Sequence, residues 1–191
     1  MSKAYQEFEI RIGPELGEEG YPFIAQGPDQ KSGAMGCFAP PYVHDEVDTV
    51  LSSRPDVYNH NIETVPRLYR EVRPGADYAR SLRVLRQAGQ GGRQARTKSG
   101  LMLGLGETPD EVEGVMRDLA SNGVAMLTLG QYLRPSPRHL PVAEFVDPAV
   151  FGRLEETARA IGFESVASAP FVRSSYHAGD MASAAAQPDA G

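Results

Sequence analysis

The sequence is poor in cysteine, with one, Cys37, among its 191 residues. A single thiol cannot form an internal disulfide, and it cannot supply a site that needs several thiolates from this chain alone. Basic residues are also the minority of the charged ones, with 19 Lys and Arg against 25 Asp and Glu. Because binding to a phosphate chain requires an excess of positive charge on one face, we do not expect a nucleic acid partner.

Long apolar runs are missing as well. The sequence has no stretch of about twenty consecutive apolar residues, which is the length that crosses a bilayer. Its first eleven residues are charged and lack the apolar segment of a signal peptide. We therefore expect no membrane association and a cytoplasmic location. The 4 histidines show no metal-ligand spacing, so each is expected to be a surface or hydrogen-bonded residue.

The distribution of glycine and proline divides the chain. Both crowd residues 1–44, which excludes a long helix there and predicts an irregular, strand-poor leader. Residues 45–180 instead show regular apolar segments separated by capped helices, which is the pattern of alternating strands and helices. The tail, residues 181–191, is small and polar and is expected to be disordered. We therefore predict one α/β domain, residues 45–180, with an unrelated or replaced leader before it.

The clearest unit lies in the middle of this domain. Ser99 to Leu105 is a continuous apolar run, as in a strand buried on both faces of a parallel sheet. Thr108, Pro109 and Glu111 then form the start of a helix with a capping box. Within residues 45–180 the prediction places strands at 56–63, 99–105, 124–130 and 165–172, and helices at 45–52, 77–88, 108–121 and 147–161. In the leader, the alternation of Phe8, Ile10 and Ile12 with charged residues predicts one short strand at 8–12.

A series of right-handed crossovers between parallel strands brings ligands to the carboxyl ends of the strands. Here those ends carry residues 59–64, 105–107, 131–133 and 173–177. The leading strand at 56–63 would also be an unpaired edge, which predicts association or poor solubility.

These strand ends and their flanks resemble lipoyl synthase, a family of radical S-adenosylmethionine enzymes. Five stretches match in the family's order and span about seven-tenths of the chain. They are PDVYNHNIETVPRLY (55–69), VRPGADY (72–78), TKSGLMLGLGE (97–107), GQYLRPS (130–136) and VRSSYHA (172–178).

The resemblance implies a fold, cofactors and partners. The fold would be a partial strand–helix barrel of the TIM type, truncated at its N-terminal side. The cofactors would be S-adenosylmethionine and two 4Fe-4S clusters. The reaction would insert two sulfur atoms into an octanoyl group to give the lipoyl group. That octanoyl group is carried by a lipoyl carrier domain or by the glycine cleavage H protein.

The resemblance also implies roles for particular residues. Those expected to face S-adenosylmethionine are Asn59, Asn61, Glu63, Lys98, Ser99, Gly104, Gln131 and Tyr132. A serine of the Arg-Ser-Ser-Tyr segment, either Ser174 or Ser175, would be a ligand of the auxiliary cluster. No catalytic residue is assigned. Without the resemblance, the favoured interpretation of Asn59, Asn61 and Glu63 would be that they end a strand through side-chain hydrogen bonds.

One departure from the family limits the expected activity. Each cluster needs thiolate ligands, and the family places two cysteine triads in its amino-terminal half. The present sequence offers Cys37 alone. Two hypotheses follow: either a second polypeptide carries the cysteine triads, or the chain is a non-catalytic remnant or binding module from a truncated or fused gene. A third, less favoured hypothesis is an unrelated half-barrel enzyme that binds another small molecule at Asn61 and Glu63. The loop with Arg134 and Arg138 could meet an acidic carrier domain or simply be solvated.

Overall fold

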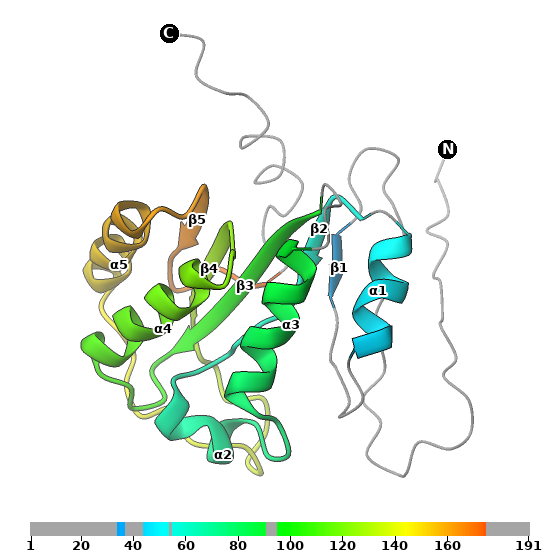
Figure 1. The fold of residues 1–191 in the computed structure, drawn as a ribbon. Helices are drawn as coiled ribbons and strands as arrows, with labels where there is room; N and C mark the ends of the chain where they lie inside the picture. The colour runs from blue at the N-terminus through cyan, green and yellow to red at the C-terminus, as the bar shows by residue number, and fades with distance from the viewer. Residues whose placement is uncertain (1–33, 37–43, 54, 91–94, 175–191) are drawn as a thin grey trace, which may run out of the picture.

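The computed structural model describes residues 34–36, 44–53, 55–90 and 95–174 (Figure 1). Within them, one parallel sheet has its five strands in chain order, β1-β2-β3-β4-β5. The strands are β1 (Ala34–Gly36), β2 (Val57–Asn59), β3 (Arg96–Leu103), β4 (Met126–Gln131) and β5 (Ser165–Ser168). The helices are α1 (His44–Ser52), η1 (Pro66–Leu68), α2 (Tyr69–Val72), α3 (Tyr78–Gln90), α4 (Pro109–Ser121) and α5 (Pro148–Ile161).

The strand order determines where the helices lie. Parallel strands that follow one another in chain order, joined by crossovers of one hand, place every helix on the same face of the sheet. The contacts agree with this, because α1 packs on α3, α3 on α4 and α4 on α5. Figure 1 shows these helices as a layer over the sheet. This is the arrangement of part of a TIM-type barrel, and the predicted fold class is confirmed.

Local sequence signals account for α4. The Thr108 Oγ1 accepts a hydrogen bond from the backbone N–H of Glu111 at 3.3 Å, and Glu111 Oε2 accepts one from the Thr108 N–H at 2.8 Å. This confirms the predicted capping box, with Pro109 at the first helical position. The helix ends at Asn122, and Gly123 follows with a φ of 80°. That left-handed conformation costs glycine little, so the chain can turn back toward β4.

Two strands are shorter than predicted. Strand β2 ends at Asn59, and Glu63 then adopts a φ of 70°, which breaks the extended conformation expected over residues 56–63. Glu63 still makes an isolated parallel bridge to Leu101. Strand β5 ends at Ser168 instead of Val172, and a turn follows it.

The prediction that residues 56–63 form an unpaired edge is wrong over β2. Strand β1 pairs with β2 in parallel, with Ala34 opposite Val57 and Gly36 opposite Asn59. Three residues of the leader thus extend the sheet. The sequence did not indicate this strand, because the composition around it is rich in glycine. Cys37, the rest of residues 1–43 and the tail 181–191 lie outside the described residues.

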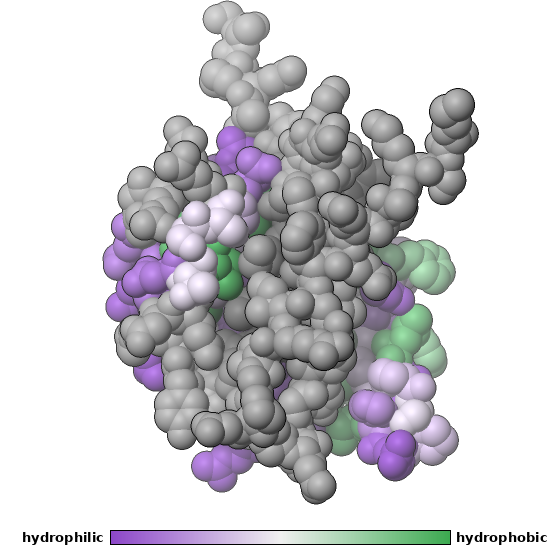
Figure 2. Space-filling view, turned by 90° about the vertical axis from the view of Figure 1, so that its right-hand side faces the viewer, coloured by the Kyte–Doolittle hydropathy of each residue, from purple (hydrophilic) through white to green (hydrophobic). Residues whose placement is uncertain are grey.

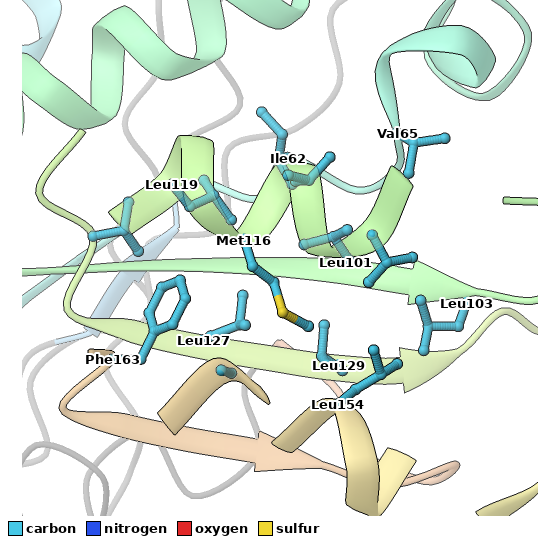
Figure 3. Packing of buried hydrophobic residues seen from close by; sticks show 14 of the residues in the cluster. Ile62, Val65, Leu101, Leu103, Met116, Leu119, Leu127, Leu129, Leu154 and Phe163 are labelled. Atoms are coloured by element: carbon cyan, nitrogen blue, oxygen red, sulfur yellow. The ribbon is translucent and has the colours of Figure 1, made fainter. Parts of the chain in front are cut away.

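The main hydrophobic core lies between the sheet and the helix layer. Figure 3 shows Met116 and Leu119 of α4 over Leu127 and Leu129 of β4. A second cluster joins α1 and α3 to β2 through Val47, Leu51, Tyr58, Val84 and Ala88. Burial of these side chains supplies the main driving force for folding. Among the described residues, no helix combines the length and apolar character needed to cross a membrane.

Candidate functional site

The two faces of the sheet carry different residues. Leu101 and Leu103 of β3 point into the helix-covered core, whereas the alternate residues Gly100 and Met102 line a cavity on the opposite face. That cavity has a volume of about 270 Å³, near the small end of the range for small-molecule sites. Its lining consists of Asn61, Glu63, Gly100, Leu101, Met102, Thr128, Gly130, Gln131, Leu133, Val172, Arg173 and Ser174.

Asn61 and Glu63 form a polar pair on one side of the cavity. The Asn61 Nδ2 donates to Glu63 Oε1 at 3.2 Å, and the buried Oδ1 of Asn61 has no partner among the described residues. Glu63 is held by its backbone, which bonds to Gly100 at 2.9 Å and to Met102 at 2.8 Å. These bonds maintain the unfavourable positive φ of Glu63. An unpartnered buried acceptor and a strained backbone are both typical of a ligand site.

The carboxyl group of Glu63 is in a mixed electrostatic environment. Burial raises its pKa above the usual value, and the hydrogen bond from Asn61 and the charges of Arg73 and Lys98 act in the opposite direction. Its charged form therefore depends on these neighbours. A ligand that donates a hydrogen bond or brings positive charge would stabilise the carboxylate further.

Lys98 lies on the same face of β3 and is 1% exposed. Its ammonium donates to the backbone oxygen of Ser174 at 2.5 Å and to Thr128 Oγ1 at 3.4 Å. Burial lowers the pKa of Lys98 to about 8, and the charge of Glu63 opposes this shift. Lys98 thus links the middle of the sheet to the segment after β5.

Two glycines bring backbone close to the cavity. A Cβ at Gly100 would lie 2.6 Å from Thr128 Oγ1 and 3.2 Å from Asn61 Oδ1. A Cβ at Gly130 would meet the Val172 carbonyl oxygen. Both positions therefore require glycine in this arrangement, because real side chains do not approach so closely.

A network behind the cavity supports Asn61. The Arg73 guanidinium donates to the backbone oxygen of Asn61 at 3.0 Å and to the Tyr69 hydroxyl at 3.1 Å. It also lies 5.7 Å from the centre of the Tyr69 ring, and the Tyr69 hydroxyl bonds to Ser81. Because α2 and α3 are packed against the core, these contacts fix the strand end that carries Asn61 and Glu63.

The structure places the predicted site residues in three groups. Asn61, Glu63, Gln131 and Ser174 line the cavity, and Lys98 bonds to Ser174 beside it. Ser175 lies outside the described residues. The remaining predicted residues, Asn59, Ser99, Gly104 and Tyr132, are not among the lining residues.

The residues outside the lining have contacts of their own. The Ser99 Oγ accepts from the Ile62 N–H at 3.1 Å, and the Tyr132 hydroxyl donates to the Leu140 oxygen at 2.9 Å. The carbonyl oxygen of Gly104 accepts from the backbone of residues 143–144. The Oδ1 of Asn59 is buried without a partner among the described residues. Apart from Asn59, these residues hold strands and loops together.

Gln131 connects the cavity to the long loop after β4. Its Nε2 donates to the backbone oxygen of Glu144 at 3.0 Å, and its Oε1 accepts from the Val146 N–H at 2.9 Å. Farther along this loop, the guanidinium of Arg134 bonds to the carbonyl oxygens of Pro137 and His139. Arg134 therefore already stabilises the loop itself.

Sequence reasoning did not single out Thr128 and Gly130, which also line the cavity, whereas Arg173 belongs to the strand end 173–177 that it named. The alternation of side chains along the strand could have revealed the first two residues, because Met126, Thr128 and Gly130 lie on one face of β4 and the core residues Leu127 and Leu129 on the other. A threonine and a glycine on the same face of an otherwise apolar strand indicate that this face is not part of the core.

The described residues contain no group of three or more His, Cys, Asp or Glu side chains placed to hold a metal ion. The sequence adds one cysteine, Cys37, outside them. A 4Fe-4S cluster usually takes one thiolate for each iron, so the donor set of this chain does not fit such a cluster by itself. The cavity offers a small ligand a carboxyl group, an amide oxygen, two glycine surfaces and the Arg173 side chain, whose Nη1 already donates to the oxygens of Pro170 and Val172.

The chain matches known proteins over the same elements. Residues 31–119 match the Radical SAM superfamily model. The lipoyl synthase of Methylococcus capsulatus (strain Bath) is 60% identical over 136 residues, which is 71% of this chain and 42% of that relative. The lipoyl synthase of Pasteurella multocida is 56% identical over 136 residues, with the same coverage, and that of Haemophilus influenzae (strain PittEE) is 55% identical over 141 residues, 74% of this chain and 44% of the relative.

Fold and match point to the same class: residues 31–119, which include β1 to β3, match the Radical SAM superfamily model, and the sheet with its helices is part of a TIM-type barrel. Within that class, the matched part of the chain is related to the lipoyl synthases. The chain spans about four-tenths of the length of the curated relatives it matches. The predicted resemblance is thus confirmed.

Proposed function

We propose that this chain supplies the S-adenosylmethionine-facing wall of a lipoyl-synthase-type site. In this proposal the site inserts sulfur into an octanoyl group that a lipoyl carrier domain or the glycine cleavage H protein presents. One observation carries the proposal most strongly: Asn61, Glu63 and Ser174, from distant parts of the chain, line a single cavity. The relationship to lipoyl synthases supports the choice of reaction.

The residues of the cavity suit the nucleoside part of S-adenosylmethionine. The carboxyl group of Glu63 can accept hydrogen bonds from ribose hydroxyls, and the free Oδ1 of Asn61 can accept another. The glycine surface at Gly100 allows a flat ring to approach the backbone. Because Glu63 is mostly buried, its carboxylate also favours a ligand with a positive sulfonium group.

The clusters require a further component in this proposal. The sequence carries one cysteine, so a second polypeptide would have to provide the thiolates of both 4Fe-4S clusters. Ser174 or Ser175 would then add an oxygen ligand to the auxiliary cluster. By itself the chain is expected to be inactive, and its place of action is expected to be the cytoplasm.

The alternative is a non-catalytic remnant or binding module. It is favoured by the same shortage of thiolates. Both proposals predict that the purified chain alone forms no lipoyl product. They differ when a polypeptide with both cysteine triads is added under anaerobic conditions with iron and sulfide, because only the enzyme hypothesis then predicts product.

A titration with S-adenosylhomocysteine tests the ligand directly. We expect calorimetry to detect binding to the full chain and expect Glu63→Gln to weaken it by about tenfold or more, since a charged hydrogen-bond acceptor is lost. Glu113→Gln is the matched control, because Glu113 lies on the side of α4 that faces away from the core and pairs with Arg117. Absence of binding, or equal binding by both variants, would contradict the proposed cosubstrate site.

A further inference from the structure

The segment after β5 forms one wall of the cavity through Val172, Arg173 and Ser174. Its backbone is attached to β4 at two points. The Gln131 N–H donates to the Pro170 oxygen at 3.2 Å, and the Ala169 N–H donates to the Leu129 oxygen at 3.2 Å. Beyond Val172 no further backbone bond to the sheet occurs among the described residues. The position of Ser174 must therefore depend on side-chain contacts.

Lys98 provides such a contact from the centre of the sheet. Its side chain is almost fully buried, and its shortest hydrogen bond goes to the backbone oxygen of Ser174 at 2.5 Å. The two residues are 76 positions apart in the sequence. A backbone oxygen is the same in every residue, so this bond fixes the chain itself and leaves the Ser174 side chain available.

A buried ammonium is costly unless it is paired. Replacing a complete buried ion pair by apolar residues is often neutral or stabilising, whereas removing one partner of a pair is costly. Lys98 has Thr128 Oγ1 as a second, longer contact at 3.4 Å and the charge of Glu63 nearby. Its closest partner is the Ser174 oxygen, so the bond that compensates the buried ammonium also fixes the segment after β5.

We infer that Lys98 is a positioning residue: through the Ser174 carbonyl it holds the wall of residues 172–174 over the cavity. This deepens the proposed function, because the held segment carries Ser174 and leads to Ser175. It differs from the expectation that Lys98 itself faces S-adenosylmethionine. Lys98 would thus set the distance between the Asn61–Glu63 side of the cavity and the serine side.

Hydrogen exchange on the ligand-free full chain tests this inference. In Lys98→Met we expect exchange at the Val172 amide and its neighbours in residues 169–174 to be about tenfold faster or more, the factor for losing one charge-assisted hydrogen bond. Exchange in α4 and at residues 126–130 of β4 should stay unchanged, and Gln131 is left out because its N–H bonds to the Pro170 oxygen of the same segment. Thr128→Val is the matched control, because it removes the longer contact of Lys98 and keeps the shorter one.

Gly130→Ala provides an independent way to displace the same wall. The added Cβ would collide with the Val172 oxygen without touching the ammonium. We expect it to reproduce the faster exchange at residues 169–174. Unchanged exchange there in Lys98→Met, or faster exchange throughout the chain with a lower midpoint, would overturn the inference. Since no ligand is used, these results are independent of whether S-adenosylhomocysteine binds.

Discussion

The helix-covered face and the cavity face of the sheet differ in the polarity of the side chains that they bury. On the helix-covered face, Leu127 and Leu129 are fully buried among other apolar side chains. On the cavity face, Lys98, Thr128 and Asn61 place polar groups in the interior, and Glu63 adopts a positive φ. Strain and buried polarity destabilise a fold unless they serve another purpose. The helix-covered face thus has the composition of a stable core, and the buried polar groups of the other face are what the proposed ligand site would require.

The exposed residues of the molecule are distributed unevenly as well. Figure 2 shows hydrophilic and hydrophobic residues intermixed along the margins of the face it presents, among the residues that are coloured. Large exposed apolar side chains instead occur in loops at the carboxyl ends of the strands, namely Leu133, Phe145 and Phe171. Leu133 also lines the cavity. Both the cavity and these loops therefore belong to the same end of the sheet.

The largest effect should come from the helix-covered face. Leu127→Ala removes a fully buried side chain and should lower the free energy of unfolding by about 2 to 5 kcal/mol. Met102→Ala is the matched control, because Met102 is only partly buried and lines the cavity. Chemical denaturation should show a clearly smaller loss for Met102→Ala. Equal losses would break the distinction between the two faces.

A cavity-face glycine should give the next effect. Gly100→Ala would place a Cβ within 2.6 Å of Thr128 Oγ1, so we expect a loss of about 1 to 3 kcal/mol in the free energy of unfolding. S-adenosylhomocysteine binding should weaken as well. In the control Gly114→Ala, the new Cβ meets nothing within 4 Å on α4, and helix propensity should raise stability by up to about 1 kcal/mol.

The capping box should contribute less. Thr108→Ala removes the side chain that accepts the Glu111 N–H, and it should cost about 1 kcal/mol in thermal or chemical denaturation. Thr157→Ala in α5 is a suitable control, since the Thr157 hydroxyl donates a hydrogen bond to the Arg153 oxygen of the same helix. S-adenosylhomocysteine binding should be unchanged in both variants. A loss of binding in Thr108→Ala would show that the helix layer is not merely a scaffold.

The smallest effect concerns acid stability. The pKa of Glu111 is lowered from 4.5 to about 2, first by the hydrogen bond from Arg67 and then by the Thr108 backbone. A lowered folded-state pKa stabilises the fold above the unfolded value of 4.5, and this stabilisation disappears as the pH falls toward about 2. In Glu111→Gln, the free energy of unfolding should therefore depend less on pH between 4.5 and about 2 than it does in the unchanged chain. Both partners are exposed, so added salt should reduce the difference.

Sequence reasoning predicted the helix-covered face better than the cavity face. The capping box at Thr108 and the apolar strand predicted at 99–105 are local signals: the capping box appears as expected, and the strand appears as β3, which begins earlier at Arg96 and ends at Leu103. The bond from Lys98 to Ser174 is not local, so no periodicity could reveal it. Strand β1 was missed because three residues among glycines carry too little pattern to identify a strand. The carbonyl of Gly104 bonds to the backbone of residues 143–144, which is likewise a non-local contact, and its expected role toward S-adenosylmethionine stays a prediction.

The central claim is that the cavity face of the sheet binds S-adenosylmethionine and that the helix layer supports it. Hydrogen exchange of the full chain with and without S-adenosylmethionine tests this most directly. We predict slower exchange at residues 61–63, 100–102, 128–131 and 172–174, with α1 and α4 unchanged. Exchange that is unaltered at these segments by saturating S-adenosylmethionine, or protection confined to the helices, would contradict it.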